Sequence, residues 1–347
     1  MRGRALKVTV LLAVFVLAEI NITAHIPARE PLENNLEQII VVGKNRGEYE
    51  TIQEAVDNAP EGSTVLVKAG SYNEIIDIKK AIQLIGENKE TTIINPISEK
   101  NKHAIRLGVP GAIVKNLSIK NGAPGLYTTG VRMSASKTEI HNCNIYGTPV
   151  GIAIWTSDNI IDNCTFWECK DEGIALIGSQ HSKCNNNTIT NCTFHDNCDG
   201  IELQYSSNNT IDNCEFFRST HTGIDAIASS NNDNTISNCE IHDNAVHGIY
   251  LSGSSRNKIT ACSISKNTDG NIVMNKNSFD NVIEEEIEPN PEINKETSNT
   301  SQIIKEVKEV VQTYHQSNEE ISLNSSIVSK ILAIISNLIS SLTKFTE

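Results

Sequence analysis

The central part of the sequence repeats one short pattern, and this repetition limits the possible folds more than any other feature. Except in the last, incomplete unit, each unit contains a Gly followed by an apolar residue and, further on, an Asn-Cys pair or a degenerate form of it. The repeated glycines lie 21 to 27 residues apart, at Gly130, Gly151, Gly173, Gly200, Gly223, Gly248 and Gly270. The cysteines of six units are Cys143, Cys164, Cys192, Cys214, Cys239 and Cys262. A period of about 22 residues indicates a repeat protein.

Within each unit, three short runs alternate apolar and polar residues, and none is long enough for a helix. Three strands in about 22 residues predict an all-β fold, the right-handed, single-stranded parallel β-helix, whose coils contact only their neighbours. Alternation along the strands places the repeated cysteines, and the Ile or Phe two residues later, in the interior. Asn suits the corner before each Cys, because Asn tolerates the left-handed backbone conformation. Thin coils also account for an aromatic content of only 5%.

The residues before the repeats complete the predicted coil stack and carry a resemblance to known proteins. Residues 49–60 predict a short amphipathic helix that closes the N-terminal end of the stack, with Thr51 as its candidate N-cap residue and Pro60 as its stop. The stretch YETIQEAVDNAPEGSTVLVKAGSYNEIIDIKKAIQLIGENKETTI resembles the opening coil of pectin methylesterases and of the wider pectin lyase-like superfamily. The repeats themselves resemble those of NosD-like and carbohydrate-active β-helix proteins. This resemblance covers residues 39–283 and implies the fold more than one activity, because one β-helix hosts many functions.

Several motifs of these families are missing from the sequence. Pectin methylesterases carry Gln-Ala-Val-Ala-Leu and Asp-Phe-Ile-Phe-Gly on later coils, and mannuronan epimerases of this fold carry Asp-Pro-His-Glu; none of the three occurs here. We therefore reject an esterase activity. NosD proteins are linked to copper-site maturation, but their repeats do not themselves establish copper binding.

The resemblance places a binding groove along the first strand of each coil and the loop before it. Alternation in Gly-Ile-x-Leu-x predicts that two rows of side chains face outward there. The first row is Arg132, Ala153, Ala175, Glu202, Asp225 and Tyr250, and the second is Ser134, Trp155, Ile177, Gln204, Ile227 and Ser252. The loops that enter these strands add Asp171, Glu172, Asp199, His221 and His247. Glu202 and Asp225 then lie on adjacent coils, about 5 Å apart at the backbone.

Neighbouring carboxyl groups at this spacing can share a proton, as acid–base chemistry on sugars requires. We assign catalysis to Glu202, Asp225, His221 and Tyr250, with His221 or, alternatively, His247 as general base and Tyr250 as proton donor. Substrate binding is assigned to Trp155, which can stack on a sugar, and to Gln204, Asp199, His247 and Arg132. The same carboxylates could instead bind Ca²⁺ through hard oxygen ligands. A simpler alternative is chance, because a chain with 42 acidic residues readily places two of them side by side.

The cysteines favour packing over metal chemistry. Six of the nine occupy one interior row, where a small apolar side chain is expected. Cys169 and Cys198 lie in equivalent loops of adjacent coils, which predicts a disulfide between them in an exported protein. The sequence contains no Cys-x-x-Cys or His-x-x-x-His spacing typical of zinc sites. Copper binding through His195, His221, His242 and His247 remains an alternative.

The two ends of the chain differ from the repeats. Residues 1–24 combine a basic start, an apolar run and a small-residue exit, which predicts a signal peptide or an N-terminal anchor. The repeat ends at about residue 283. Residues 284–301 predict an acidic, polar linker, and residues 302–347 predict an amphipathic helical tail. This tail could close the open end of the coil stack, self-associate or contact a membrane surface.

These observations together predict a secreted or cell-surface protein that binds or processes an extracellular polysaccharide along its coils. If it is an enzyme, the resemblance implies a polysaccharide lyase, a glycoside hydrolase or an epimerase-like activity. A non-catalytic adhesion module and a NosD-like accessory of copper maturation remain alternatives. A formal net charge of −13 argues against a nucleic-acid partner, whose phosphates need clustered Lys and Arg.

Overall fold

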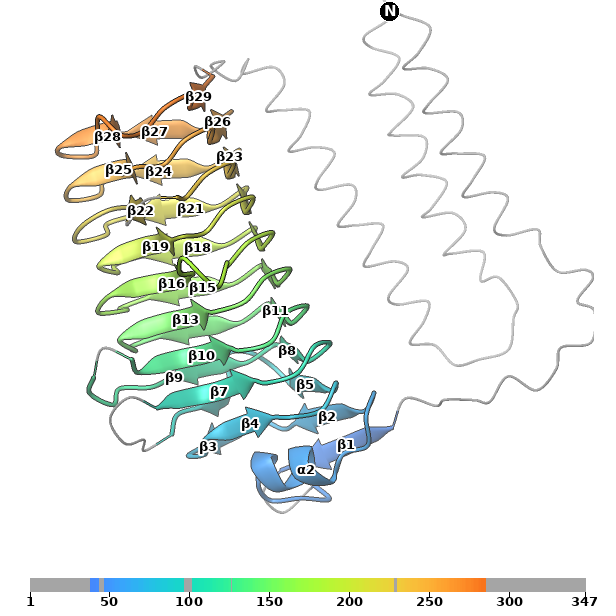
Figure 1. Ribbon diagram of the computed structural model, residues 1–347. Coiled ribbons are helices and arrows are strands. Elements are labelled where there is room, and N and C mark those ends of the chain that lie inside the picture. The colour runs from blue at the N-terminus through green and yellow to red at the C-terminus, as the bar shows by residue number, and fades with distance from the viewer. Residues whose placement is uncertain (1–37, 44–46, 97–101, 126, 228–229, 285–347) are drawn as a thin grey trace, which may run out of the picture.

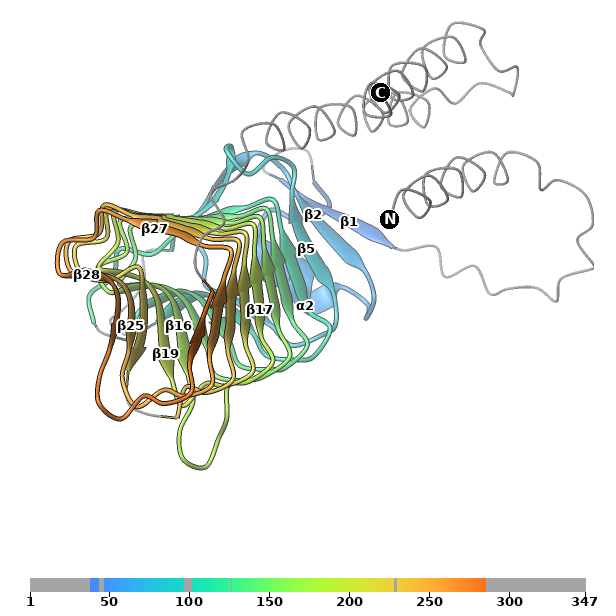
Figure 2. The ribbon, with the colours of Figure 1, turned by 90° about the horizontal axis from the view of Figure 1, so that it is seen from above.

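The computed structural model describes residues 38–284, except 44–46, 97–101, 126 and 228–229. Short strands from successive coils stack into three long parallel sheets, so that each sheet collects about every third strand of the chain (Figure 1). The view along the stack shows the coils lying over one another with the three sheets as its sides (Figure 2). The all-β parallel β-helix is therefore confirmed. The expected signal segment and helical tail lie outside the described residues, as does nearly all of the linker.

The sheets are named here by the first and last strands in chain order. The β1–β29 sheet contains β1 (Ile39–Val42), β2 (Thr64–Val67), β5 (Gln83–Gly86), β8 (Ile113–Lys115), β11 (Glu139–His141), β14 (Ile160–Asp162), β17 (Thr188–Thr190), β20 (Thr210–Asp212), β23 (Thr235–Ser237), β26 (Lys258–Thr260) and β29 (Val282–Ile283). The β3–β27 sheet contains β3 (Gly70–Tyr72), β6 (Thr92–Ile94), β9 (Ser118–Lys120), β12 (Asn144–Tyr146), β15 (Thr165–Trp167), β18 (Thr193–His195), β21 (Glu215–Phe217), β24 (Glu240–His242) and β27 (Ser263–Ser265). The β4–β28 sheet contains β4 (Ile76–Ile78), β7 (His103–Leu107), β10 (Thr129–Met133), β13 (Val150–Ile154), β16 (Glu172–Ile177), β19 (Asp199–Gln204), β22 (Ile224–Ile227), β25 (His247–Leu251) and β28 (Gly270–Met274).

The interior consists of aligned rows of apolar side chains, one from each coil. The six repeated cysteines are all buried, between 0 and 8% exposed, which confirms their predicted inward orientation. Phenylalanines two residues after Cys stack face to face, with ring centroids 4.7 Å apart for Phe166 and Phe194 and 4.6 Å apart for Phe194 and Phe216. Because every row repeats at the coil spacing, each side chain packs against its own equivalents above and below.

Asparagine has two separate roles in the coils. Five of the six repeated cysteines follow an Asn whose φ is positive, as predicted for a tight corner. These residues are Asn142, Asn163, Asn191, Asn213 and Asn238, with φ between 50° and 55°. A second row, which the sequence analysis did not identify, runs inside the corner before the β1–β29 sheet. It comprises Asn159, Asn187, Asn209, Asn234 and Asn257, which are at most 4% exposed. Each amide oxygen accepts the backbone N–H of the preceding coil, for example Asn187 N to Asn209 Oδ1 at 2.8 Å.

The repeated glycines allow neighbouring coils to approach closely where the strands of the β4–β28 sheet begin. A Cβ on Gly200 would lie 2.5 Å from the carbonyl oxygen of Gly223 and 2.6 Å from the ring of Phe216. Gly151, Gly173 and Gly223 meet the next coil in the same way. Glycine is therefore required here by the contact between coils, which fixes how the strands of this sheet begin.

Helix α2 (Ile52–Asn58) lies at the N-terminal end of the stack and ends before Pro60, as predicted (Figure 1). Thr51 is its first flanking residue, but the Thr51 side chain forms no capping hydrogen bond. The carboxylate of Glu74 caps the helix instead, accepting the backbone N–H groups of Ile52 and Gln53, each at 3.0 Å. Such a cap from a neighbouring coil cannot be found by inspecting the helix sequence alone. In the described part of the chain, no helix has the length and apolarity needed to cross a membrane.

Candidate functional site

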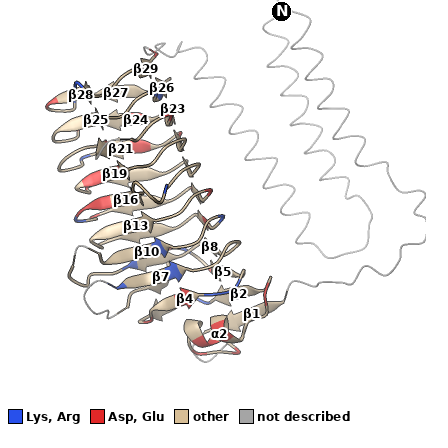
Figure 3. Ribbon diagram, viewed as in Figure 1, with Lys and Arg blue, Asp and Glu red and all other residues tan. Residues whose placement is uncertain are grey.

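The predicted outward row on the β4–β28 sheet is a continuous row in the structure. Residue pairing across adjacent strands follows the order Arg132, Ala153, Ala175, Glu202, Asp225 and Tyr250. Figure 3 shows how charge is distributed on this sheet, with basic residues on β7 and β10 and acidic residues on β16 and β19. The two alanines between them are almost fully buried, because Trp155 and Ile177 of the second row pack over them. The sheet thus presents a basic part, an apolar part and an acidic part in succession.

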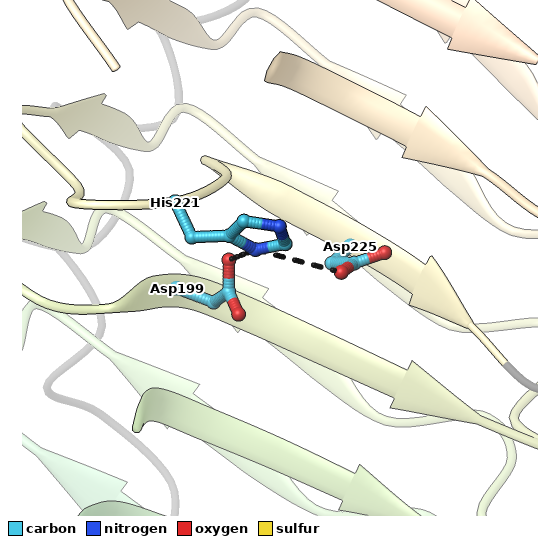
Figure 4. A group of neighbouring side chains, drawn as sticks. All are labelled: Asp199, His221 and Asp225. Atoms are coloured by element: carbon cyan, nitrogen blue, oxygen red, sulfur yellow. Dashed lines mark hydrogen bonds and ion pairs between the residues drawn. The ribbon is translucent and has the colours of Figure 1, made fainter. Parts of the chain in front are cut away.

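The acidic part contains a compact group of ionisable side chains that we call the acid–histidine cluster, defined by Glu172, Asp199, Glu202, His221 and Asp225. The loop before β22 carries His221 between the carboxylates of Asp199 and Asp225 (Figure 4). His221 Nδ1 is 2.8 Å from Asp199 Oδ1 and 3.9 Å from Asp225 Oδ2. The backbone N–H of Thr222 also donates to Asp199 Oδ1, at 2.7 Å, and so fixes that carboxylate.

The other two carboxylates of the cluster come from neighbouring strands. Glu202 on β19 pairs in register with Asp225 on β22, and Glu172 on β16 pairs with Asp199 on β19. Gln204 donates from Nε2 to Glu202 Oε1 and thereby orients this half-buried carboxylate. Within the described part of the chain, Asp199 and Asp225 form ion pairs only with His221, and Glu172 and Glu202 form none. The cluster therefore concentrates negative charge without a Lys or Arg to balance it.

Burial and mutual repulsion shift the ionisation of this cluster. Burial, followed by the charges of Asp171 and Glu202, raises the pKa of Glu172 to about 9. Burial, together with the negative charge of Asp199, raises the pKa of Asp225 to about 7. Burial also raises the pKa values of Asp199 and Glu202. Each carboxyl group therefore holds its proton more tightly than a carboxyl in water does.

Buried polar atoms near the cluster have no hydrogen-bond partner among the described residues. They are Asp225 Oδ1, Thr222 Oγ1 and His247 Nδ1. Asp225 is 4% exposed and Thr222 is 0% exposed, so neither side chain is freely solvated. Leaving such atoms unpaired costs about 1–3 kcal/mol each, which is why buried polar groups in proteins nearly always have partners.

The remaining predicted site residues lie on either side of the cluster along the same sheet. Tyr250 on β25 pairs in register with Asp225 and stacks on His247, with ring centroids 5.1 Å apart. Arg132 lies on the other side, over the ring of Trp155 at 5.2 Å from the ring centroid. Trp155 follows directly after β13, which lies two strands before β19 and its Gln204 in the sheet. The structure thus brings Asp199, Glu202, His221 and Asp225 together and places Arg132 and Trp155 several coils away.

From the sequence, Glu172 was expected only in a loop, and Thr222 was not expected to belong to the site. A usable signal was present, because the position before each repeated Gly carries Glu172, Asp199, Thr222 and His247 in successive coils. All four of these residues contribute to the site or border it.

The expected disulfide between Cys169 and Cys198 is absent from the structure, in which both side chains are free thiols. The two residues are neighbours across coils, since Cys198 N donates to Cys169 O at 3.1 Å. The side chain of Cys169 is buried, at 2% exposed, whereas Cys198 is half-buried.

The fold and this outward acidic site define a class of protein, the parallel β-helix with a polar face along one sheet. The family model "Right handed beta helix region" matches residues 80–232 and 129–287, and the chain belongs to this family. The chain is thus a right-handed β-helix of the pectin lyase-like superfamily.

Known proteins resemble the chain in sequence or in fold. A pectinesterase from Petunia integrifolia is 35% identical over 135 residues, which is 34% of this chain and 36% of the relative. A pectinesterase from Daucus carota is 24% identical over 142 residues, 36% of this chain and 44% of the relative. The matched region thus spans less than half the length of these curated relatives.

Among solved structures, the mannuronan C-5 epimerase AlgE4 A-module of Azotobacter vinelandii superposes with a TM-score of 0.51 and 16% identity. This match covers 67% of the present chain and 90% of the module. The tailspike protein 2 domain of bacteriophage CBA120 gives 0.52 at 15% identity, over 67% of this chain and 40% of the tailspike chain. At these identities the likeness extends to the fold alone.

Proposed function

We propose that the protein is an exported enzyme that binds a polysaccharide along the outer face of the β4–β28 sheet and processes it at the acid–histidine cluster. The geometry of Glu202 and Asp225 carries this proposal. These two carboxylates occupy paired positions on adjacent coils, face outward and have no Lys or Arg partner among the described residues. Structural acidic residues on a β-helix surface have no need of such a cluster, whereas proton transfer to a glycosidic or uronate substrate does.

Other residues along the same sheet supply the remaining requirements of a sugar-processing site. Trp155 offers an aromatic surface and Arg132 a cation on the basic side of the sheet, while Tyr250 offers a hydroxyl on the opposite side. Relatives of the chain are named pectinesterases, and the superposed epimerase is named for mannuronan, so both names refer to polysaccharide substrates. We therefore expect an acidic polysaccharide to lie across several coils, with its reacting unit beside Glu202.

Activity is best tested on pectin, polygalacturonate and polymannuronate with three readouts. Unsaturated product absorbance reports a lyase, new reducing ends report a hydrolase, and released methanol reports an esterase, which we do not expect. Glu202→Gln and Asp225→Asn should each lower turnover about 100-fold or more, because general acid–base groups contribute this much. Binding of the polysaccharide should remain, since both substitutions preserve the shape of the side chain.

Glu240→Gln is the matched control, because Glu240 is an exposed carboxylate on the β3–β27 sheet, away from the cluster. Turnover by this variant should equal that of the unaltered protein. Equal turnover by all three variants would contradict the assignment of the site. Polysaccharide binding without turnover in the unaltered protein would instead favour a non-catalytic adhesion module.

A further inference from the structure

Three donor atoms of the acid–histidine cluster are close enough to contact a single ion. One ligand atom each from Asp199, His221 and Asp225 lie within 4.8 Å of one another, on two adjacent coils (Figure 4). We propose that these three residues bind one divalent transition-metal ion of the Zn²⁺ class. The proposal goes beyond polysaccharide processing and does not require it, because the ion would bind to the free protein.

The spacing of the donors supports a metal site. Donors bound to one Zn²⁺ at about 2.0–2.2 Å lie roughly 3–3.5 Å apart in tetrahedral geometry. The distance between His221 Nδ1 and Asp199 Oδ1 is 2.8 Å, and that between His221 Nδ1 and Asp225 Oδ2 is 3.9 Å. Both distances differ from this range by about half an ångström or less, and the donor atoms of Asp199 and Asp225 lie within 4.8 Å of each other.

A separate observation, the unpartnered oxygen of Asp225, also points to a ligand. This side chain is only 4% exposed, and its Oδ1 atom has no hydrogen-bond partner among the described residues. Asp199 is 5% exposed and has His221 as its only ion-pair partner in the described chain. Two buried carboxylates that share one imidazole have an unbalanced charge, and a divalent cation between them would compensate it.

The nature of the donors selects the class of metal. Imidazole nitrogen is a ligand typical of Zn²⁺, Cu²⁺, Ni²⁺ and Fe²⁺, whereas Ca²⁺ prefers about six to eight oxygen ligands. His221 Nδ1 lies between the two carboxylates, so an ion placed there would meet nitrogen as well as oxygen. A site with three protein ligands also leaves a fourth position for water or substrate. The backbone N–H of Thr222 orients Asp199, as outer hydrogen bonds commonly do for ligating side chains.

The test uses the full chain after dialysis against EDTA, with calorimetric titration of ZnCl₂ and, separately, of CaCl₂. We expect one Zn²⁺ per chain, tighter binding of Zn²⁺ than of Ca²⁺, and a melting temperature that rises by a few degrees with excess Zn²⁺. His221→Asn and Asp225→Asn should each weaken Zn²⁺ binding about 100-fold or more. Circular dichroism in EDTA would establish that both variants remain folded.

His195→Asn provides a matched control. His195 also contacts a carboxylate, with Nδ1 2.6 Å from Asp196 Oδ2, but that carboxylate is already paired with Arg218. This variant should bind Zn²⁺ like the unaltered protein.

Co²⁺ bound to the unaltered protein should give visible absorption bands that His221→Asn abolishes. Absence of Zn²⁺ binding, binding unaffected by His221→Asn, or tighter binding of Ca²⁺ than of Zn²⁺ would each overturn the proposal. None of these measurements involves a polysaccharide, so the outcome is separate from that of the proposed function.

Discussion

One residue position, the one before each repeated Gly, shows how the repeat accommodates function. The apolar Val150 occupies it in one coil and the acidic Glu172 and Asp199 occupy it in the next two. All three side chains are buried, at 5 to 7% exposed. A buried carboxyl opposes folding unless it keeps its proton or gains a cation. The chain thus places destabilising residues at one site of an otherwise regular stack, which is expected where function outweighs stability.

Glu172→Gln should stabilise the protein at alkaline pH. The pKa of Glu172 is raised from its ordinary value of 4.5 to about 9, so the folded state holds a proton that the unfolded state releases. The stabilising protonation is complete below pH 4.5 and is lost as pH rises toward 9. Because Gln has no proton to lose, the variant should gain about 2 kcal/mol or more at pH 8 and little at pH 4.5.

Urea unfolding in EDTA at the two pH values measures this difference, with Glu240→Gln as the exposed control. An equal change in stability at both pH values would contradict the pKa assigned to Glu172.

At the level of strands and corners, the repeat made most of the fold predictable. Six cysteines at one period define both the coil length and the inward face, and the pairing of Glu202 with Asp225 follows from them. Loop side chains are different, because no period determines their rotamers. The adjacency of Cys169 and Cys198 was predictable, but their unequal burial was not. The approach of His221 to Asp199 likewise depends on the loop before β22, and the sequence could only place both residues in the same region.

The buried row of asparagines from Asn159 to Asn257 joins each coil to the next through side-chain hydrogen bonds. Asn209 accepts the backbone N–H of Asn187 at 2.8 Å and donates to the carbonyl of Cys184 at 3.2 Å. Asn209→Ala would leave these buried groups without partners and should lower the free energy of unfolding by about 2–4 kcal/mol. Asn277→Ala, at an exposed position of the last coil, should change it by less than about 0.5 kcal/mol. Similar losses for the two variants in chemical denaturation would show that the row contributes little.

Considered as a whole, the molecule arranges its surface along one axis. Arg106 and Arg132 lie on neighbouring strands at one part of the β4–β28 sheet, and Glu202 and Asp225 lie on neighbouring strands further along it. Three coil steps separate Arg132 from Glu202, or roughly 14 Å at the spacing of parallel strands. Because a parallel stack gives every coil the same direction, a long ligand could contact both parts in only one favourable orientation. An acidic polymer would place negative groups toward the arginines and its reacting unit toward the carboxylates.

The core also extends along this axis, and the rate at which its cysteine thiols react measures how readily the coil stack opens. Eight of the nine cysteines are buried, and Cys198 alone is half-buried. In the native protein, Cys198 should therefore react with a thiol reagent in a fast step. The other eight should react slowly, at a rate set by unfolding, because repeated cysteines such as Cys192 and Cys214 are enclosed by coils on both sides. In denaturant all nine thiols should titrate, whereas a disulfide between Cys169 and Cys198 would leave seven. Fast reaction of several thiols would show instead that individual coils open independently, as weakly coupled repeats do.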